Sequence, residues 1–432
     1  MEKVKQLGLS KDKMDLKQQL NEMGEKAKAA SAVLNTAPSI QKNSFFDFAI
    51  KEIESDQELI LMANHQDVAQ AKDAGKDAAF IDRLELNHDR LKGICATLEE
   101  IKLFPDPVGK ILANWDRPNG LNISRVSTPL GVIGIIFESR PNVASDAGGL
   151  CLKSGNAVIL RSGKDGLRSA SALVTAMQKA LLKAGLPKES IQIVPSENRE
   201  AATLMLEGLN GSIDVIVPRG GKSLVAEVEK SAKVPVFGHL EGICHVYVDE
   251  HADLKKALEI CINAKMRRTG ICGAAETILL HQKIATSFGP DLIAKLSSLN
   301  CEVRGCKKTL SLDQYVIPAT EKDWSTEYLA PIVSIKVVDD AEEAIRHISA
   351  YGTGHTESII SEDLKAQNQF TASIDSAIVM INTSTQFADG GEFGLGGEIG
   401  IATGKFHARG PVGLDQLTSF KYIVSGDGQI RS

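Results

Sequence analysis

Several features are missing from this chain of 432 residues, and each absence excludes a class of protein. No apolar run approaches the roughly 18 residues of a membrane-spanning helix, and the N-terminus lacks the apolar stretch of a signal peptide. The seven cysteines form no Cys-x-x-Cys pair, so the sequence predicts neither a disulfide framework nor a metal site. We therefore expect a cytoplasmic protein, because free thiols persist in a reducing compartment.

The chain also lacks an excess of basic residues. Its 49 lysines and arginines are outnumbered by 55 acidic residues, which gives a net charge of −6. Nucleic-acid-binding domains usually present a strongly basic face, so no nucleic-acid partner is expected. With 43% hydrophobic residues the composition is that of an ordinary globular protein, and the length predicts two or three lobes.

Hydrophobic periodicity divides the chain into a helical part and two α/β parts. The first hundred residues have apolar side chains at helical spacing, as in Phe45, Phe46, Ala49 and Ile53. Further along, short β-branched runs alternate with helix-like segments, a pattern typical of a parallel sheet covered on both faces. The expected strands of this first series are residues 132–137, 157–160, 191–194 and 215–217.

A second α/β series follows Cys272. Its expected strands are residues 276–280, 331–338 and 376–381, and its expected helices lie near residues 284–299 and 340–348. Two α/β lobes are therefore predicted. The chain ends in a strand-like tail at residues 418–424, and a strand after a completed domain often pairs with another lobe or subunit.

Cys272 lies between an expected helix and an expected strand, with Gly270 and Gly273 close to it in the sequence. Such glycines leave room for a substrate to approach the backbone. Arg267 and Arg268 precede the cysteine and would favour the thiolate, which is the nucleophilic form. The pattern indicates a nucleophile that forms an acyl-enzyme, although an isolated cysteine is more often a small core residue.

No G-x-G-x-x-G fingerprint follows the first expected strand, and the Gly-rich stretch at residues 394–400 has the wrong spacing. Two loops at strand ends are better candidates for a cofactor phosphate, although each alone could be only a surface turn. One loop carries two cations, and the other precedes an expected helix whose N–H groups would face an anion. The residues are Arg161, Ser162, Gly163 and Lys164 in the first loop, and Arg219, Gly220 and Gly221 in the second.

Several segments resemble one family. They are residues 128–134, 138–143, 155–161, 242–249, 351–359, 393–396 and 407–414, together with the cysteine segment. These motifs resemble the γ-glutamyl phosphate reductases (glutamate-5-semialdehyde dehydrogenases), within the aldehyde dehydrogenase superfamily. The resemblance runs from about residue 44 to the C-terminus. It implies an α/β, aldehyde dehydrogenase-like fold with two doubly wound α/β lobes and a small β oligomerisation flap.

The same resemblance implies a reaction. Members of the family reduce L-glutamyl 5-phosphate to L-glutamate 5-semialdehyde with NADPH and release phosphate, in the second step of proline biosynthesis from glutamate. Cys272 corresponds to the family's nucleophile. Its thiolate would attack the acyl phosphate, and the resulting thioester would accept the hydride, as expected of an NADP-dependent oxidoreductase.

Other residues take their implied roles from the same motifs. Asn142 matches an asparagine that supports the oxyanion with the Cys272 N–H, and an Asx turn is the alternative. Glu327 matches the glutamate that binds the ribose hydroxyls of the cofactor, whose extra phosphate would meet a cation of the first loop. His245 and His355 are interpreted as structural histidines. The substrate-binding candidates, whose individual targets stay open, are Arg140, Arg268, Ser384, Thr385, His407 and Arg409.

Three positions depart from related patterns. Hydrolytic aldehyde dehydrogenases carry a general-base glutamate in a Glu-Leu-Gly-Gly stretch, whereas Glu241 in the corresponding residues 238–242 is out of register. We do not assign Glu241 as a base, because a reductase that expels phosphate has less need to activate water. Gly273 stands where the family commonly has asparagine. Gln386 stands where it commonly has arginine, which removes a cation that could reach the substrate or the other lobe.

The resemblance also gives expected boundaries and partners. The NADPH-binding domain is expected at residues 1–110 and 129–245, the catalytic domain at 246–385, a Gly-rich interlobe segment at 386–410, and the oligomerisation flap at 111–128 and 411–432. We expect a homo-oligomer without a membrane partner. Channelling from glutamate 5-kinase is consistent with the lability of acyl phosphates. The alternatives are a hydrolytic semialdehyde dehydrogenase of the same fold and a non-catalytic binding protein.

Overall fold

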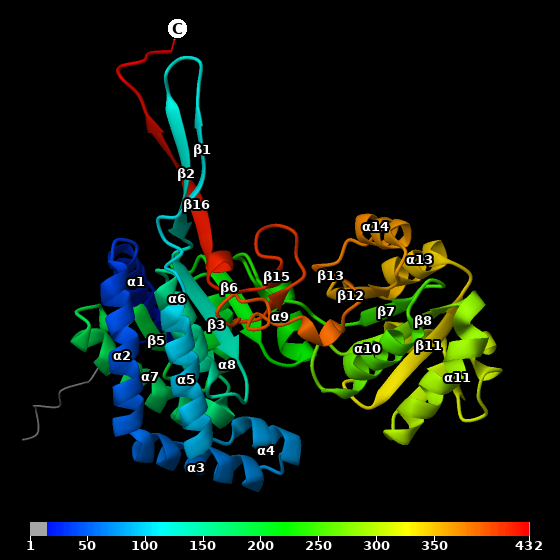
Figure 1. Cartoon of the computed structure of the whole chain (residues 1–432). Coiled ribbons are helices and arrows are strands. Elements are labelled where there is room, and N and C mark those ends of the chain that lie inside the picture. Colours follow the sequence, from blue (N-terminus) through cyan, green and yellow to red (C-terminus); the bar gives the residue numbers. More distant parts are fainter. Residues whose placement is uncertain (1–14, 432) are drawn as a thin grey trace, which may run out of the picture. The chain divides into compact units, whose positions relative to one another are not determined.

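The computed structural model describes residues 15–431, and the chain divides into two compact units (Figure 1). The first unit contains the described residues up to Val217, then Val228–Val236 and the chain from Ser419. The second unit contains Pro218–Glu227 and Phe237–Thr418. None of the described helices is long and apolar enough to cross a membrane.

The first unit begins with a group of helices. They are α1 (Leu16–Leu34), α2 (Ser39–Ser55), α3 (Gln57–Asp73), α4 (Ala78–Leu84) and α5 (His88–Leu103). Helix α2 buries Phe45, Phe46, Ala49 and Ile53, as their helical spacing predicts. Asn87 caps the N-terminus of helix α5, and its side chain accepts a hydrogen bond from a backbone N–H of the first turn.

A four-stranded sheet follows, in the order β5-β4-β3-β6. Strands β3 (Val132–Phe137) and β4 (Ala157–Ser162) are parallel and buried at every position, which explains their continuous apolar sequence. Helix α1 contacts β3, β4 and β5, and helices α6 and α7 also contact the sheet. The remaining elements are α6 (Val143–Lys153), η1 (Lys164–Gly166), α7 (Leu167–Lys183), η2 (Lys188–Ser190), β5 (Ile191–Ile193), α8 (Arg199–Leu206), β6 (Val215–Arg219) and α9 (Lys222–Ser231).

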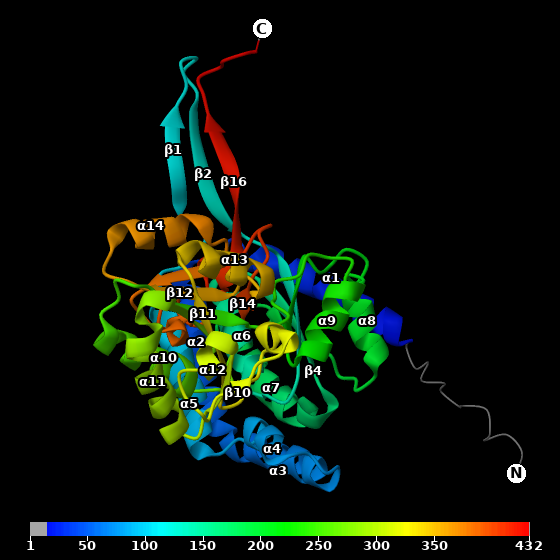
Figure 2. The ribbon, with the colours of Figure 1, turned by 90° about the vertical axis from the view of Figure 1, so that its right-hand side faces the viewer.

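A separate three-stranded sheet has the order β1-β2-β16, and both views show its strands side by side (Figures 1 and 2). Strands β1 (Ile111–Asp116) and β2 (Asn122–Pro129) form an antiparallel hairpin. Strand β16 (Thr418–Ser425) comes from the end of the chain. The strand-like tail therefore pairs with the hairpin of its own chain. A role of this sheet in assembly stays a prediction.

The second unit is built on a seven-stranded sheet in the order β10-β9-β11-β8-β7-β12-β13, with parallel pairing throughout. Its strands are β7 (Cys244–Val248), β8 (Ala275–His281), β9 (Glu302–Gly305), β10 (Ile317–Pro318), β11 (Ile332–Val338), β12 (Thr356–Ile360) and β13 (Ile378–Ile381). The connecting elements are α10 (Leu254–Met266), α11 (Gln282–Ser298), α12 (Lys307–Leu310), η3 (Glu321–Ser325), α13 (Ala341–Tyr351), α14 (Leu364–Ser373) and η4 (Thr385–Phe387). Strands β14 (Ile401–Ala402) and β15 (Gly410–Pro411) pair separately, and η5 (Asp415–Leu417) follows.

Successive residues of one strand enter different hydrophobic clusters in this unit. On β7, Val246 and Val248 pack in a cluster with Leu292 of α11, whereas Tyr247 packs in another cluster with Phe370 of α14. Side chains alternate across a strand, so both faces of the sheet are covered. The α/β class predicted from the sequence is confirmed in both units.

Candidate active site

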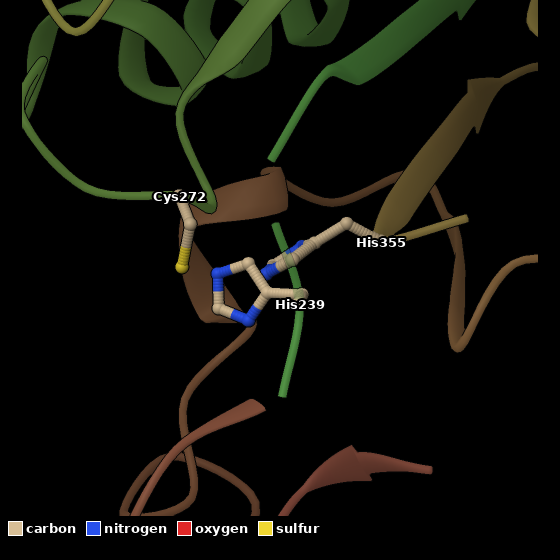
Figure 3. A group of neighbouring side chains, drawn as sticks. All are labelled: His239, Cys272 and His355. Atoms are coloured by element: carbon tan, nitrogen blue, oxygen red, sulfur yellow. The ribbon is translucent and has the colours of Figure 1, made fainter. Parts of the chain in front are cut away.

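Three side chains from separate loops converge in the second unit: His239, Cys272 and His355 (Figure 3). They precede β7, β8 and β12, respectively. These strands are parallel neighbours in the order β8-β7-β12, so their amino ends lie along one edge of the sheet. The Cys272 sulfur and one nitrogen of each imidazole all lie within 4.8 Å of one another. Strand pairing therefore assembles a cluster that is dispersed in the sequence.

The Cys272 thiol is half-buried, and burial raises its pKa to about 12. The carboxylate of Glu398 raises it further, the Arg219 guanidinium lowers it, and Glu327 again raises it. The thiol is therefore the resting form of this side chain. A nucleophilic attack by its sulfur needs a base.

The expectation that Arg267 and Arg268 favour the thiolate is wrong. Both side chains are exposed, and Arg267 donates a hydrogen bond to Gln386 at 3.3 Å. The cation whose charge acts on Cys272 is Arg219, and burial outweighs its effect on the thiol pKa. Sequence proximity alone did not reveal which arginine lowers the pKa of the thiol.

His239 offers a base to the thiol. Its Nδ1 lies 2.7 Å from the carbonyl oxygen of Ile401. A carbonyl oxygen only accepts hydrogen bonds, so Nδ1 carries the ring proton and Nε2 keeps its lone pair. Figure 3 shows this second nitrogen turned toward the Cys272 sulfur. Burial lowers the pKa of His239, which keeps the ring neutral at neutral pH.

His355 is fully buried, and its ring makes an edge contact with that of His239, with centroids 4.8 Å apart. Its Nδ1 lies 2.8 Å from Thr356 Oγ1 and 3.5 Å from Cys244 Sγ. The Cys244 thiol donates to the carbonyl oxygen of Cys272 at 3.1 Å, so toward His355 this sulfur can only accept. With its proton on Nδ1, His355 can donate to the Thr356 hydroxyl, which is able to accept or to donate. Nε2 has no hydrogen-bond partner among the described residues, and burial lowers the pKa of His355 to about 3.

Glu327 anchors the backbone beside Cys272. Its Oε1 accepts a hydrogen bond from the Gly242 N–H at 2.9 Å. Burial raises the pKa of this carboxyl group. Gly242 in turn lies against the Cys272 backbone, so the carboxylate helps to hold the loop that contacts Cys272. The ribose-binding role of Glu327 stays a prediction.

A buried ion pair joins the elements on either side of Cys272. Lys265 of α10 lies 2.5 Å from Glu276 of β8, and both side chains are almost completely buried. The other oxygen of Glu276 accepts a hydrogen bond from the Leu329 N–H at 3.3 Å. The pair therefore also holds the segment that carries Glu327.

Gln386 forms hydrogen bonds with the backbone between the end of α10 and Cys272. Its side-chain amide donates to the carbonyl oxygens of Ala264 at 2.9 Å and Arg268 at 3.2 Å. The residue that replaces the family's arginine thus satisfies backbone groups at the end of α10. Next to it, Gly273 lies so close to the Thr385 carbonyl that a Cβ would be 3.1 Å from that oxygen. A side chain at position 273 would require this contact to open slightly.

Two of the predicted substrate residues, Ser384 and Thr385, are buried in this region. The Ser384 hydroxyl accepts a hydrogen bond from the Gln386 N–H, and Ser384 lines a cavity of about 320 Å³ that also includes Arg267. The Thr385 hydroxyl has no hydrogen-bond partner among the described residues. Arg268, which precedes Cys272 by four positions in the sequence, has an exposed side chain. Substrate contacts for these residues stay predictions.

The first predicted phosphate loop follows β4. Phe137 and Ser162 are register partners, so the segments after β3 and β4 leave the sheet at the same edge. Arg161 is buried with its Nε unpartnered among the described residues, and burial lowers the pKa of its guanidinium. The Ser162 hydroxyl donates to the Gly163 carbonyl at 3.0 Å, and Lys164 is exposed at the start of η1.

The segment after β3 carries Arg140 and Asn142. Arg140 is exposed. Asn142 lies at the start of α6, and its side-chain amide donates to Asp146 at 2.8 Å. Both residues belong to the first unit, whereas Cys272 belongs to the second. The oxyanion role of Asn142 stays a prediction.

The other predicted residues lie in the second unit. Gly220 and the following Gly221 are exposed between β6 and α9, next to Arg219. Arg409 forms an ion pair with Asp375 at 2.9 Å. The ring of His407 stacks on that of Phe237, with centroids 5.4 Å apart. Arg409 and His407 thus each have a structural partner within the chain. The ligand-binding roles of all these residues stay predictions.

Sequence reasoning did not select His239 or place His355 beside Cys272. A signal for His239 was present: aligned on its leucine, the stretch His239-Leu240-Glu241-Gly242 puts the histidine where Glu-Leu-Gly-Gly has the base. Glu241 instead forms an ion pair with Lys222 at 2.5 Å. The other histidine of the motifs, His245, lies in a different cluster, 2.9 Å from Glu357.

Comparison with known proteins adds independent evidence. The profile of the aldehyde dehydrogenase family matches residues 12–309 and 316–423. γ-Glutamyl phosphate reductase of Parvibaculum lavamentivorans is 54% identical over 423 residues, which cover 98% of this chain and 100% of the relative. The same-named protein of Brucella suis biovar 1 is 55% identical, over 96% of this chain and 99% of the relative. The crystal structure of γ-glutamyl phosphate reductase from Thermotoga maritima matches 96% of this chain and 100% of its own, with a TM-score of 0.94 and 44% identity.

Proposed function

Because this chain belongs to the aldehyde dehydrogenase family, and within it to the γ-glutamyl phosphate reductases, we propose that it reduces L-glutamyl 5-phosphate to L-glutamate 5-semialdehyde and releases phosphate. NADPH is the proposed reductant, and the reaction would serve proline biosynthesis. The observation that supports this chemistry is that the Cys272 sulfur lies within 4.8 Å of a His239 ring nitrogen, with the unprotonated Nε2 turned toward it. It provides a nucleophile together with the base that activates it.

The proposed reaction begins when the Cys272 proton passes to His239 Nε2 and the sulfur attacks the carbonyl carbon of the acyl phosphate. The C–S bond forms and gives a tetrahedral adduct. When the carbonyl C=O bond re-forms, the C–O bond to phosphate breaks, and phosphate leaves with the electron pair and takes a proton from solvent. A thioester remains on Cys272. NADPH, when bound, supplies the hydride that reduces this thioester. The C–S bond then breaks, the aldehyde departs, and the sulfur recovers its proton from His239.

The residues present fit a phosphorylated dinucleotide. Arg161 keeps a buried N–H unpartnered among the described residues, and Lys164 is exposed three residues later. An unpaired buried donor is costly unless a ligand satisfies it, so an anionic oxygen is a suitable partner. We propose that these two cations bind the cofactor phosphates and that Glu327 accepts from its ribose hydroxyls.

The hydrolytic semialdehyde dehydrogenase remains the alternative, because His239 could equally take a proton from water. The test is the reverse reaction, in which glutamate 5-semialdehyde is oxidised with NADP⁺ in the presence and absence of inorganic phosphate. We expect turnover only with phosphate, and none for Cys272→Ala in either condition. Oxidation that proceeds equally without phosphate would favour hydrolysis. Turnover by Cys272→Ala would refute the thioester mechanism itself.

We also propose that the chain forms a homo-oligomer. The support is the β1-β2-β16 sheet, where large apolar side chains are exposed on both the hairpin and the C-terminal strand. Monomeric proteins rarely leave a broad apolar patch uncovered. Transfer of the acyl phosphate from a kinase stays a proposal that rests only on the lability of that substrate.

A further inference from the structure

We propose that His239, Cys272 and His355 form a zinc-binding site, in which Zn²⁺ reversibly blocks the nucleophile. Zinc favours imidazole nitrogen and cysteine sulfur, and a site with three protein ligands keeps one position open for water. The three candidate ligand atoms already lie within 4.8 Å of one another in one unit of the chain. This inference goes beyond the proposed reaction, which needs no metal.

The hydrogen bonds around the two histidines support the assignment. A zinc-bound histidine usually donates its other ring N–H to a protein acceptor, which fixes the ring and its tautomer. His239 Nδ1 makes this contact with the Ile401 carbonyl at 2.7 Å. His355 Nδ1 lies 2.8 Å from Thr356 Oγ1. Both rings are therefore held through Nδ1, which leaves the Nε2 of His239 with a lone pair and gives the Nε2 of His355 one when its Nδ1 donates to Thr356.

The second independent observation is the unsatisfied Nε2 of His355. This side chain is fully buried, and its Nε2 has no hydrogen-bond partner among the described residues. A buried polar atom normally has a partner, so an unsatisfied one aimed at a thiol indicates a missing ligand. Figure 3 shows the ring of His355 directed toward His239 and Cys272.

The geometry requires only a small adjustment. Zn–S bonds are about 2.3 Å and Zn–N bonds about 2.0–2.1 Å, so tetrahedral ligands lie roughly 3.3–3.7 Å apart. Since no separation exceeds 4.8 Å, each must close by at most about 1.5 Å. Cys272 lies in a loop between α10 and β8, where a side-chain rotation can supply this movement. When zinc binds, the Cys272 thiol releases its proton to solvent, and the sulfur electron pair that would attack the substrate is shared with the metal.

Binding can be measured without substrate or cofactor. The reduced, metal-free full chain is titrated with Co²⁺, whose sulfur-to-cobalt charge-transfer absorption reports a thiolate ligand, and Zn²⁺ is then added as a competitor. We expect the band to saturate at one ion per chain and to disappear with Zn²⁺. In Cys272→Ser the band should be absent. A band that persists in this variant would assign the metal to another cysteine and overturn the proposal.

The histidines are tested by affinity. We expect His355→Gln to weaken Zn²⁺ binding about tenfold or more, and Thr356→Val, which keeps all three ligands, to weaken it about tenfold through the loss of the Nδ1 contact. His251→Ala is the matched control, because this exposed histidine contacts Asp249 instead. Equal affinity in His355→Gln, Thr356→Val and His251→Ala would refute the site.

A protection assay connects binding to inhibition. Zn²⁺ should shield Cys272 from iodoacetamide, as read by mass spectrometry, and a chelator should restore its alkylation. Unchanged alkylation with saturating zinc would contradict the proposal. None of these measurements involves turnover. A negative result for zinc therefore leaves the proposed reaction untouched, and a negative result for that reaction leaves the zinc measurements valid.

Discussion

Gly242 lies against the backbone of Cys272 so closely that a Cβ at position 242 would be 2.1 Å from the Cys272 carbonyl oxygen. The same glycine donates its N–H to Glu327 at 2.9 Å. Position 242 therefore admits no side chain unless the backbone of Cys272 moves. This contact makes the placement of the sulfur depend on a residue that takes no part in the chemistry.

We expect Gly242→Ala to lower kcat/KM by about a hundredfold, because a displacement of about 1 Å of a reacting group can cost that much. Gly270→Ala is the control: it lies in the same loop as Cys272, and a Cβ there would meet no atom within 4 Å. Steady-state kinetics of the two variants provide the measurement. Equal activities would show that the loop adapts without loss.

The role of His239 predicts a pH dependence. We expect His239→Gln to lower kcat/KM by about 10²–10⁴-fold, the usual contribution of a general base. Burial lowers the pKa of His239, so the wild-type acid limb should lie below the ordinary range of histidine. The neutral ring is the active form, and activity falls as the pH drops through that pKa.

In His239→Gln, the rate should rise with pH across the neutral range. The pKa of Cys272 is about 12, so the thiolate fraction grows as the pH increases toward that value. The pH profiles are recorded with a chelator present, so that no metal competes for the thiol. If the pH profile of His239→Gln kept the acid limb of the wild-type enzyme, His239 would be excluded as the base.

The sequence predicted much of this arrangement because its signals are local. Parallel strands such as β3 and β4 are buried on both faces, so their continuous apolar runs are visible in the sequence. Cys272 was identified from its glycine-flanked junction and the family motif. These features depend on residues within a few positions of one another.

The rest of the site depends on long-range pairing. His239 meets Cys272 because β7 pairs with β8, and His355 joins them because β12 pairs with β7. No local pattern encodes that strand order. The thiol pKa was likewise misjudged from Arg267 and Arg268, because burial, which is a property of the folded chain, outweighs the charge of any single arginine.

The buried ion pair between Lys265 and Glu276 predicts a stability effect. We expect Lys265→Met to lower the free energy of unfolding by about 3–5 kcal/mol, because it leaves a buried carboxylate without its partner. Lys256→Met on the same helix is the control, since its pair with Glu362 is exposed to solvent and should contribute little to stability. Urea denaturation monitored by circular dichroism gives both values. Similar losses in the two variants would mean that burial of the pair is unimportant.

The β1-β2-β16 sheet predicts the assembly state. Tyr422 is 56% exposed and stacks edge-on against Trp115, with ring centroids 6.2 Å apart. If this apolar surface is covered by another copy, Tyr422→Asp would bury a charge there and should yield monomers, because an unpaired charge in an interface is strongly destabilising. Lys421→Asp, on the opposite face of β16, should assemble normally, since successive side chains of a strand point to opposite faces.

Size-exclusion chromatography with light scattering gives the mass of each variant, and deletion of residues 418–432 should reproduce the monomer. Circular dichroism shows whether each variant is folded. Folded Tyr422→Asp with the wild-type mass would place the subunit interface elsewhere. Monomeric wild-type protein would remove oligomerisation as an explanation for these exposed apolar side chains, which would then need another partner.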